Sequence, residues 1–251
     1  MQNTLVSIIT PSYNSVKFIK DTIDSVLVQT YTNWEMIIVD DKSKDNSVDY
    51  INNLIKVDSR IKLIALDKNI GAAMARNKAL EVANGRYIAF LDSDDVWTSQ
   101  KLEKQLEFMN KNNYAFTFSN YIPFSEDGKE EYKTIVVPNE LNYSQYCKNT
   151  IIGCLTVVID KEKVGSFKMP NIRSSHDMAL WLLIMKRGFK AYGLNEVLGK
   201  YRLVSTSNTS KKYKAAKEVW DVYRKVEKLS LTKSAWYFIN YIFNALKKRK
   251  Q

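Results

Sequence analysis

The chain of 251 residues contains only two cysteines, four prolines, eight glycines and one histidine. It has no tract rich in Ser, Gly or Pro and no internal repeat, which leaves no place for a long flexible linker. Cys147 and Cys154 lie seven positions apart without a C-x-x-C pattern, which favours reduced, structural thiols in the cytosol. A hydrophobic share of 45% is ample for a core, so we expect a globular protein.

Several functional segments are absent as well. No apolar run approaches the roughly 20 residues of a membrane span. The first strand pattern starts within a few residues of Met1, and we expect no targeting segment. No G-x-x-x-x-G-K-[ST] occurs, which excludes a P-loop nucleotide site, and N-I-G-A-A-M-A-R-N (69–77) lacks the G-x-G-x-x-G spacing of a dinucleotide fold.

The positive charge is concentrated at one end of the chain. Residues 211–251 hold twelve Lys or Arg against three acids, which accounts for +9 of the formal net charge of +11. The remaining residues are nearly neutral, whereas a nucleic-acid-binding body would carry its basic residues on the fold itself. The charge therefore indicates a basic C-terminal appendage.

Strand and helix patterns alternate through the first half of the chain, which predicts right-handed βαβ crossovers and a mostly parallel sheet. Apolar strand segments are expected at 5–10, 34–41, 61–66 and 86–91. A helix in 69–85 is expected to end at Gly85. Beyond residue 112 the pattern weakens to strands at 114–119 and 154–160, a hairpin around 125–130, and tail helices at 211–229 and 232–247.

Polar segments follow the predicted strands at one edge of this sheet. They are P-S-Y-N (11–14), D-D-K-S (40–43), N-I-G (69–71) and D-S-D-D (92–95). Ligands bind outside the carboxyl ends of parallel strands, where helix N-termini point inward. We therefore expect these segments to converge on one crevice.

Asp92, Asp94 and Asp95 bring three carboxylates to that crevice. Like charges at this spacing repel unless a cation neutralises them, and a hard divalent ion takes one or two carboxylates together with water and phosphate oxygens. Asp92 and Asp94 are thus a candidate metal and diphosphate site. The alternative is that D-S-D-D caps the N-terminus of the helix that follows it.

The ordered motifs resemble a known family. V-S-I-I-T-P-S-Y-N through D-D-K-S-K-D-N-S, followed by N-I-G-A-A-M-A-R-N through F-L-D-S-D-D, is similar to the nucleotide-sugar half of the family-two inverting glycosyltransferases. The likeness covers residues 4–112, and more loosely extends to 203 through S-S-H-D-M-A-L-W-L-L-I-M-K-R-G. It implies an α/β GT-A fold, in which helices flank a mixed, mostly parallel sheet. The GT-A domain would span residues 1–210, with a nucleotide-sugar half (1–112) and an acceptor half (113–210). A C-terminal helical appendage would follow at 211–251.

The resemblance also implies roles for residues on the nucleotide side. Tyr13 would stack on the uracil, with Pro11 in the same motif, and Asp40 would accept a hydrogen bond from the uracil imide. Asp92 would face the ribose, and Asp94 would hold Mn²⁺ or Mg²⁺ against the diphosphate.

Three further residues have two interpretations each. Arg76 is either a contact near the nucleotide or part of a buried ion pair. Asp95 is a secondary nucleotide contact or a cap, and Asp41, a cap or turn former, is left out of the site.

Asp177 matches the family's acidic position and would be the general base that accepts the proton of the acceptor hydroxyl. It precedes a helix whose Leu180, Trp181 and Ile184 should pack inward. The preceding residue is often Glu in the family and is His176 here. Three interpretations of this histidine are open: it has no chemical role, it contacts the acceptor, or it is an outer metal ligand.

The last predicted helix carries a stripe of apolar residues and ends in four consecutive cations, Lys247–Lys250. The stripe consists of Ala235, Trp236, Ile239, Ile242, Phe243 and Leu246. Such a helix can lie in the interface of an anionic membrane. The alternatives are a helix packed in the core or a dimer contact.

Together these observations predict a metal-dependent UDP-sugar glycosyltransferase (a hexosyltransferase) that is cytoplasmic and peripheral on the inner face of the cell membrane. Its acceptor would be a glycan or lipid-linked saccharide in bacterial surface polysaccharide assembly. A processive synthase is disfavoured because membrane spans and a Q-x-x-R-W pattern are missing. The remaining alternative is a basic RNA-binding or scaffold protein that keeps the fold without turnover.

Overall fold

The computed structural model describes residues 4–56, 58–204 and 212–250. Its first half is the predicted parallel sheet, in the order β3-β2-β1-β4. The strands are β1 (Val6–Ser12), β2 (Trp34–Asp40), β3 (Ile61–Ala65) and β4 (Tyr87–Phe90). Every residue of β1, β2 and β4 is buried, as expected for apolar parallel strands with helices on both faces.

Helices cover the two faces of this sheet and form two hydrophobic cores. One core lies under α1 (Ile19–Leu27), α2 (Ser47–Ile55) and α4 (Lys101–Asn112). The other lies under α3 (Ala72–Val82) and α7 (His176–Lys186). Side chains alternate between the faces along a strand, so Ile8 belongs to the first core and Ile9 to the second.

The prediction that Gly85 ends α3 is wrong, because the helix already stops at Val82. Gly85 instead lets the chain pass close to β1: a Cβ atom there would lie 2.5 Å from the backbone nitrogen of Ser7. Its own amide donates to Ser7 Oγ at 2.8 Å. Glycine is required here because the segment before β4 passes too close to β1 for any side chain.

The second half extends the sheet with antiparallel and parallel pairs, which confirms the predicted mixed sheet. Its strands, ordered β4-β8-β6-β9-β5 with β7 on β9, are β5 (Val96–Trp97), β6 (Phe116–Ser125), β7 (Glu140–Leu141), β8 (Val158–Asp160) and β9 (Ala191–Leu203). Two short helices, α5 (Tyr143–Lys148) and α6 (Lys161–Val164), connect them.

Two predictions for this half have different outcomes. The strand expected at 154–160 is present only in its second part, as β8 (Val158–Asp160). Its first part, Cys154–Thr156, forms a 3-10 turn, η1. The expected hairpin is present: the amide of Ser125 donates to the carbonyl of Glu130 at 2.8 Å, and Gly128 adopts φ 78°.

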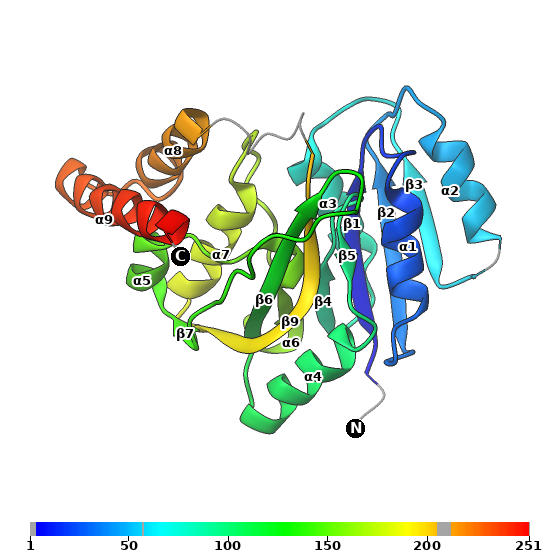
Figure 1. Ribbon diagram of the computed structural model, residues 1–251, viewed down its shortest axis with the longest axis horizontal. Helices are drawn as coiled ribbons and strands as arrows, with labels where there is room; N and C mark the ends of the chain where they lie inside the picture. Colours follow the sequence, from blue (N-terminus) through cyan, green and yellow to red (C-terminus); the bar gives the residue numbers. More distant parts are fainter. Residues whose placement is uncertain (1–3, 57, 205–211, 251) are drawn as a thin grey trace.

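The predicted tail helices are present as α8 (Lys212–Asp221), a π-helical turn η3 (Val222–Val226) and α9 (Leu231–Lys250). They lie at the end of the molecule opposite α2 (Figure 1). Val219, Val222 and Tyr223 are buried in the same core as α3 and α7. The side-chain amide of Asn244 donates to the carbonyl of Lys148 at 2.9 Å, which fixes α9 on α5. Within the described ranges, no helix is both long and apolar enough to cross a membrane.

Lys101, the first residue of α4, is fully buried. Its Nζ lies 4.3 Å from the ring centroid of Trp97 and has no hydrogen-bond partner among the described residues. Burial lowers the pKa of the Lys101 ammonium well below its ordinary value of 10.5. Between the lowered pKa and 10.5, the unfolded chain binds a proton at this residue that the folded chain does not, so stability rises with pH there.

The variant Lys101→Met should therefore be at least as stable as the wild type at pH 7, because it removes the cost of burying the amine. Its advantage should shrink as the pH rises towards 10.5, by up to about 1.4 kcal/mol per pH unit. Urea unfolding of both proteins between pH 7 and 10 measures the difference. A constant difference across this range would show that Lys101 keeps its proton in the fold.

Candidate active site

One cavity of about 730 Å³ brings together acids from both halves of the chain. It lies at the carboxyl edge of β4 and beside the start of α7. Of the predicted site residues, its lining includes Arg76, Asp92, Asp94, Asp95 and Asp177. Of the four polar segments expected to converge on one crevice, D-S-D-D (92–95) borders this cavity together with Asp177 of the acceptor-side motif, whereas no residue of P-S-Y-N, D-D-K-S or N-I-G lines it.

The predicted uracil-side residues do not line this cavity but lie next to one another at the ends of β1 and β2. Pro11 is paired with Val39 across the two strands. Asp40, at the end of β2, is 1% exposed, whereas Tyr13 is 47% exposed. The Asp40 carboxylate closes the turn that follows it, accepting hydrogen bonds from the amide of Ser43 at 2.8 Å and its hydroxyl at 2.5 Å.

The three acids after β4 occupy a tight turn, in which the amide of Asp95 donates to the carbonyl of Asp92 at 3.1 Å. Burial and then the charge of Asp92 raise the pKa of Asp94 to about 6. Burial and the charges of Asp94 and Asp92 raise the pKa of Asp95 well above its usual range. The interpretation of this turn as a helix cap is wrong, because β5 intervenes and α4 begins only at Lys101.

Arg76 connects the two sides of the cavity. Its side chain is 5% exposed and forms an ion pair with Asp92 through Nη2. Nη1 lies 2.5 Å from Nε2 of His176. A guanidinium can only donate, so Nε2 must accept and the imidazole is neutral. Burial and the Arg76 charge also lower the pKa of His176. The predicted buried ion pair is thus present, in the lining of the cavity.

Asp177 lies in the first turn of α7, after Ser175, which adopts the left-handed conformation with φ 54°. The three residues predicted to pack inward, Leu180, Trp181 and Ile184, are each 0% exposed. The ring of Trp181 meets Phe90 of β4 edge-on, with centroids 5.3 Å apart. This contact sets the helix that carries Asp177 against the strand that leads to Asp92.

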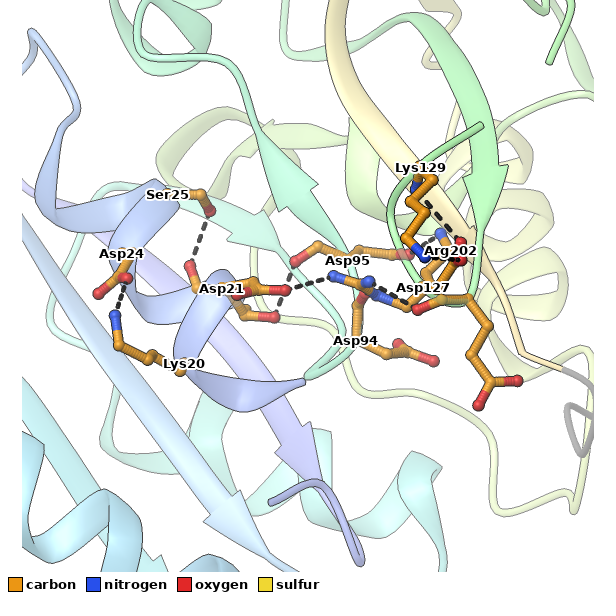
Figure 2. A network of polar contacts seen from close by, with 11 residues as sticks. Lys20, Asp21, Asp24, Ser25, Asp94, Asp95, Asp127, Lys129 and Arg202 are labelled. Atoms are coloured by element: carbon orange, nitrogen blue, oxygen red, sulfur yellow. Dashed lines mark hydrogen bonds and ion pairs between the residues drawn. The ribbon is translucent and has the colours of Figure 1, made fainter. Parts of the chain in front are cut away.

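Arg202, near the end of β9, is a site residue that the sequence analysis missed. Figure 2 shows it between Asp21 of α1 and the turn of Asp94 and Asp95. Its amide donates to Asp95 Oδ1 at 2.9 Å, and its Nε to the carbonyl of Asp94 at 2.8 Å. Nη1 donates to the carbonyl of Glu126 at 3.0 Å, and Nη2 to Asp21 Oδ2 at 2.8 Å. No sequence motif signals a contact between residues so distant along the chain.

Asp41 also has a clearer role than the turn former expected from the sequence. Its carboxylate accepts hydrogen bonds from the amides of Ile70 at 2.6 Å and Gly71 at 2.7 Å. These amides lie directly before α3, which carries Arg76. Asp41 therefore fixes the start of α3 to the end of β2.

The variant Arg202→Met keeps much of the side-chain length but removes every guanidinium donor. It should lower the free energy of unfolding by about 2–4 kcal/mol, because the two carbonyl acceptors of Asp94 and Glu126 each lose a partner. The matched control is Lys129→Met, on an 81% exposed cation of the same region, which should change stability by less than about 0.5 kcal/mol. Equal losses in urea unfolding would contradict a special role for Arg202.

Comparison with known proteins identifies the family. The model of Glycosyl transferase family 2 matches residues 7–169. TuaG of Bacillus subtilis (strain 168), a glycosyltransferase named for teichuronic acid biosynthesis, is 54% identical over 245 residues, which cover 98% of this chain and 97% of TuaG. WfgD of Escherichia coli, named UDP-Glc:alpha-D-GlcNAc-diphosphoundecaprenol beta-1,3-glucosyltransferase, is 42% identical over 252 residues, covering 99% and 96%.

Solved structures share the fold. S. aureus TarS 1–349 in complex with UDP-GlcNAc matches with a TM-score of 0.70 at 17% identity, covering 95% of this chain and 71% of that chain. Mannosyltransferase PcManGT from Pyrobaculum calidifontis, with GDP-Man and Mn²⁺, matches with a TM-score of 0.70 at 14% identity, covering 98% and 75%. The chain therefore belongs to glycosyl transferase family 2 and has the GT-A fold that its ordered motifs predict.

Proposed function

We propose that the protein transfers a sugar from a UDP-sugar to a lipid-linked glycan acceptor during assembly of a bacterial surface polysaccharide. The observation that carries this proposal is the single cavity that joins the acidic turn of Asp94 to Asp177. The names of the relatives support it, since TuaG is named for teichuronic acid biosynthesis and WfgD for a UDP-Glc donor and a diphosphoundecaprenol acceptor. An RNA-binding or scaffold protein without turnover would not need such a cavity.

Residues 1–112 would form the donor half and 113–210 the acceptor half, with 211–251 as a basic helical end. On the donor side Tyr13 is free to stack on the uracil, with Pro11 in the strand beside it. Asp40 would receive the imide hydrogen, in competition with its contacts to Ser43. Asp92 would face the ribose with the oxygen that Arg76 leaves open, and Asp95 would support the same turn.

A divalent cation, Mn²⁺ or Mg²⁺, fits the acidic turn. The raised pKa of Asp94 marks a carboxylate whose charged form a cation would stabilise. In the described part of the chain, no three His, Cys, Asp or Glu residues are grouped to hold a metal ion. Asp94 would therefore be joined by water and the donor diphosphate as ligands, as is usual for Mg²⁺. When bound, the ion would neutralise the charge that develops on the leaving diphosphate.

Asp177 would act as the general base of an inverting displacement. The acceptor hydroxyl oxygen attacks the anomeric carbon and its proton passes to the Asp177 carboxylate, while the bond from carbon to the diphosphate oxygen breaks and releases UDP. His176 is less suited to this role because Arg76 occupies its Nε2. Arg76 would instead hold His176 and Asp92 in place on either side of the reacting groups.

The exposed face of α9 suggests attachment to the inner surface of the cytoplasmic membrane. Tyr237, Phe238 and Tyr241 pack against the core, whereas five other apolar residues of α9 are exposed. These are Leu231 (63% exposed), Trp236 (59%), Ile239 (52%), Phe243 (70%) and Leu246 (50%). Aromatic and aliphatic side chains beside many cations are typical of helices that lie in an anionic membrane interface.

The base is tested by Asp177→Asn, which keeps the shape of the side chain but cannot accept the proton. Sugar transfer should fall by about 10²- to 10⁴-fold, while UDP affinity stays within twofold of the wild type. Transfer rate and calorimetric UDP binding would be measured on the same preparations. Full transfer by Asp177→Asn would assign the base elsewhere.

The membrane contact is tested with the double variant Trp236→Ser and Phe243→Ser, which leaves the packed face of α9 intact. Flotation with anionic liposomes should fall strongly, because each buried apolar side chain contributes about 1.5–3 kcal/mol. The matched control is the double variant Val28→Ser and Val136→Ser, at two residues that are each 61% exposed elsewhere on the surface. Equal flotation of both double variants would exclude α9 as the anchor.

A further inference from the structure

The cavity extends from the acidic turn and Asp177 to the C-terminal helices. Its lining at that end comes from the C-terminal helices, through Ala215, Glu218 and Val219 of α8 and Tyr241 of α9. These helices are fixed there by the buried Val222 and Tyr223. The part of the cavity that these helices line therefore belongs to the folded protein, and the whole cavity measures about 730 Å³, a volume typical of ligand-binding sites.

Acidic side chains outnumber basic side chains in the lining of the cavity. The carboxylates are Asp92, Asp94, Asp95, Asp177 and Glu218, against the guanidinium groups of Arg76 and Arg173. Arg76 is buried and committed to Asp92 and His176. Arg173 is exposed and, across the ranges that the structure describes, has no hydrogen bond or ion pair with any other residue. An anion that enters beyond Asp177 would meet Arg173 as its available cation.

Arg173 also lies close to the proposed base. It lies four positions before Asp177 in the chain, so their Cα atoms are at most about 14 Å apart even in a fully extended chain. The left-handed conformation of Ser175, φ 54°, turns the chain between them, and both side chains border the same cavity. A guanidinium binds phosphate oxygens through two parallel hydrogen bonds, which gives direction as well as charge.

We propose that Arg173 binds the diphosphate of a glycosyl-diphospho-lipid acceptor and thereby places the acceptor's sugar hydroxyl at Asp177. This inference rests on the proposed function. The donor diphosphate is expected at Asp94, on the other side of Asp177 along the cavity. The cavity is also bordered by α8 and α9, so the lipid would leave it beside α9, whose outer face carries the exposed apolar residues.

The site can be tested by binding alone. Farnesyl diphosphate is titrated by calorimetry into protein already saturated with UDP and Mn²⁺, so that the donor site is filled. Wild-type protein should bind it, and Arg173→Gln should weaken binding by about 10-fold or more, as expected for loss of a charged hydrogen-bonding partner. Arg173→Lys should lose less of the affinity for farnesyl diphosphate than Arg173→Gln. Farnesol should bind equally to wild type and Arg173→Gln, which separates the diphosphate from the lipid tail.

The matched control is Lys168→Gln, which removes one positive charge from the same loop at a 67% exposed side chain that pairs with Glu81 outside the cavity. It should change farnesyl diphosphate affinity by less than about twofold. An unchanged affinity in Arg173→Gln, no binding by the wild type, or equal losses in both variants would overturn the proposal. A fall in UDP affinity in Arg173→Gln would also overturn it, since it would assign Arg173 to the donor.

Turnover provides a second readout that separates this inference from the proposed function. With N-acetylglucosaminyl diphospho-lipid as acceptor, Arg173→Gln should raise KM by about 10-fold or more with little change in kcat. With an alkyl N-acetylglucosaminide that lacks the diphosphate, KM should not change. If the wild type transfers sugar to neither acceptor, the proposed acceptor is wrong, whereas the calorimetric result still decides whether Arg173 binds a diphosphate.

Discussion

The packing of Trp181 against Phe90 is the contact on which the geometry of the site depends. Phe90 ends the strand that delivers Asp92, Asp94 and Asp95, and Trp181 lies one turn into the helix that begins at His176 and Asp177. Both rings are fully buried, and Phe116 of β6 packs against the same indole, with centroids 5.3 Å apart. Interiors packed at this density permit little movement, so this contact sets the separation between the acidic turn and the proposed base.

The charges of the site are held in place from two directions. Arg76 of α3 pairs with Asp92 from one side, and Arg202 of β9 binds the carbonyl of Asp94 and, through its amide, the carboxylate of Asp95 from the other. Three neighbouring carboxylates repel one another, and burial together with these charges raises the pKa of Asp94 and Asp95. The contacts of the two arginines hold the turn in place against this repulsion, and like charges gathered in this way are a pattern expected of a functional site.

Under the proposed function, the C-terminal helices would combine two roles in one element. Tyr241 of α9 borders the cavity and Phe243, two residues later, is 70% exposed on the opposite face. Because side chains two positions apart on a helix point in very different directions, a single helix can face both the acceptor site and a membrane surface. A lipid-linked substrate would then reach the proposed base without leaving the bilayer surface.

The sequence by itself determined the first half of the fold and the position of its acids. Apolar strands that end in P-S-Y-N, D-D-K-S and D-S-D-D follow local periodicity, and parallel strands bring their carboxyl ends to one edge whatever their lengths. The close passage of Gly85 against Ser7, the turn at Cys154, and the contacts of Arg76 with His176 and of Arg202 with Asp95 were decided only by the tertiary structure. Apart from the local turn at Cys154, each of these joins segments far apart in the chain, and no local pattern encodes which distant residue will complete a buried charge or pass close to a strand.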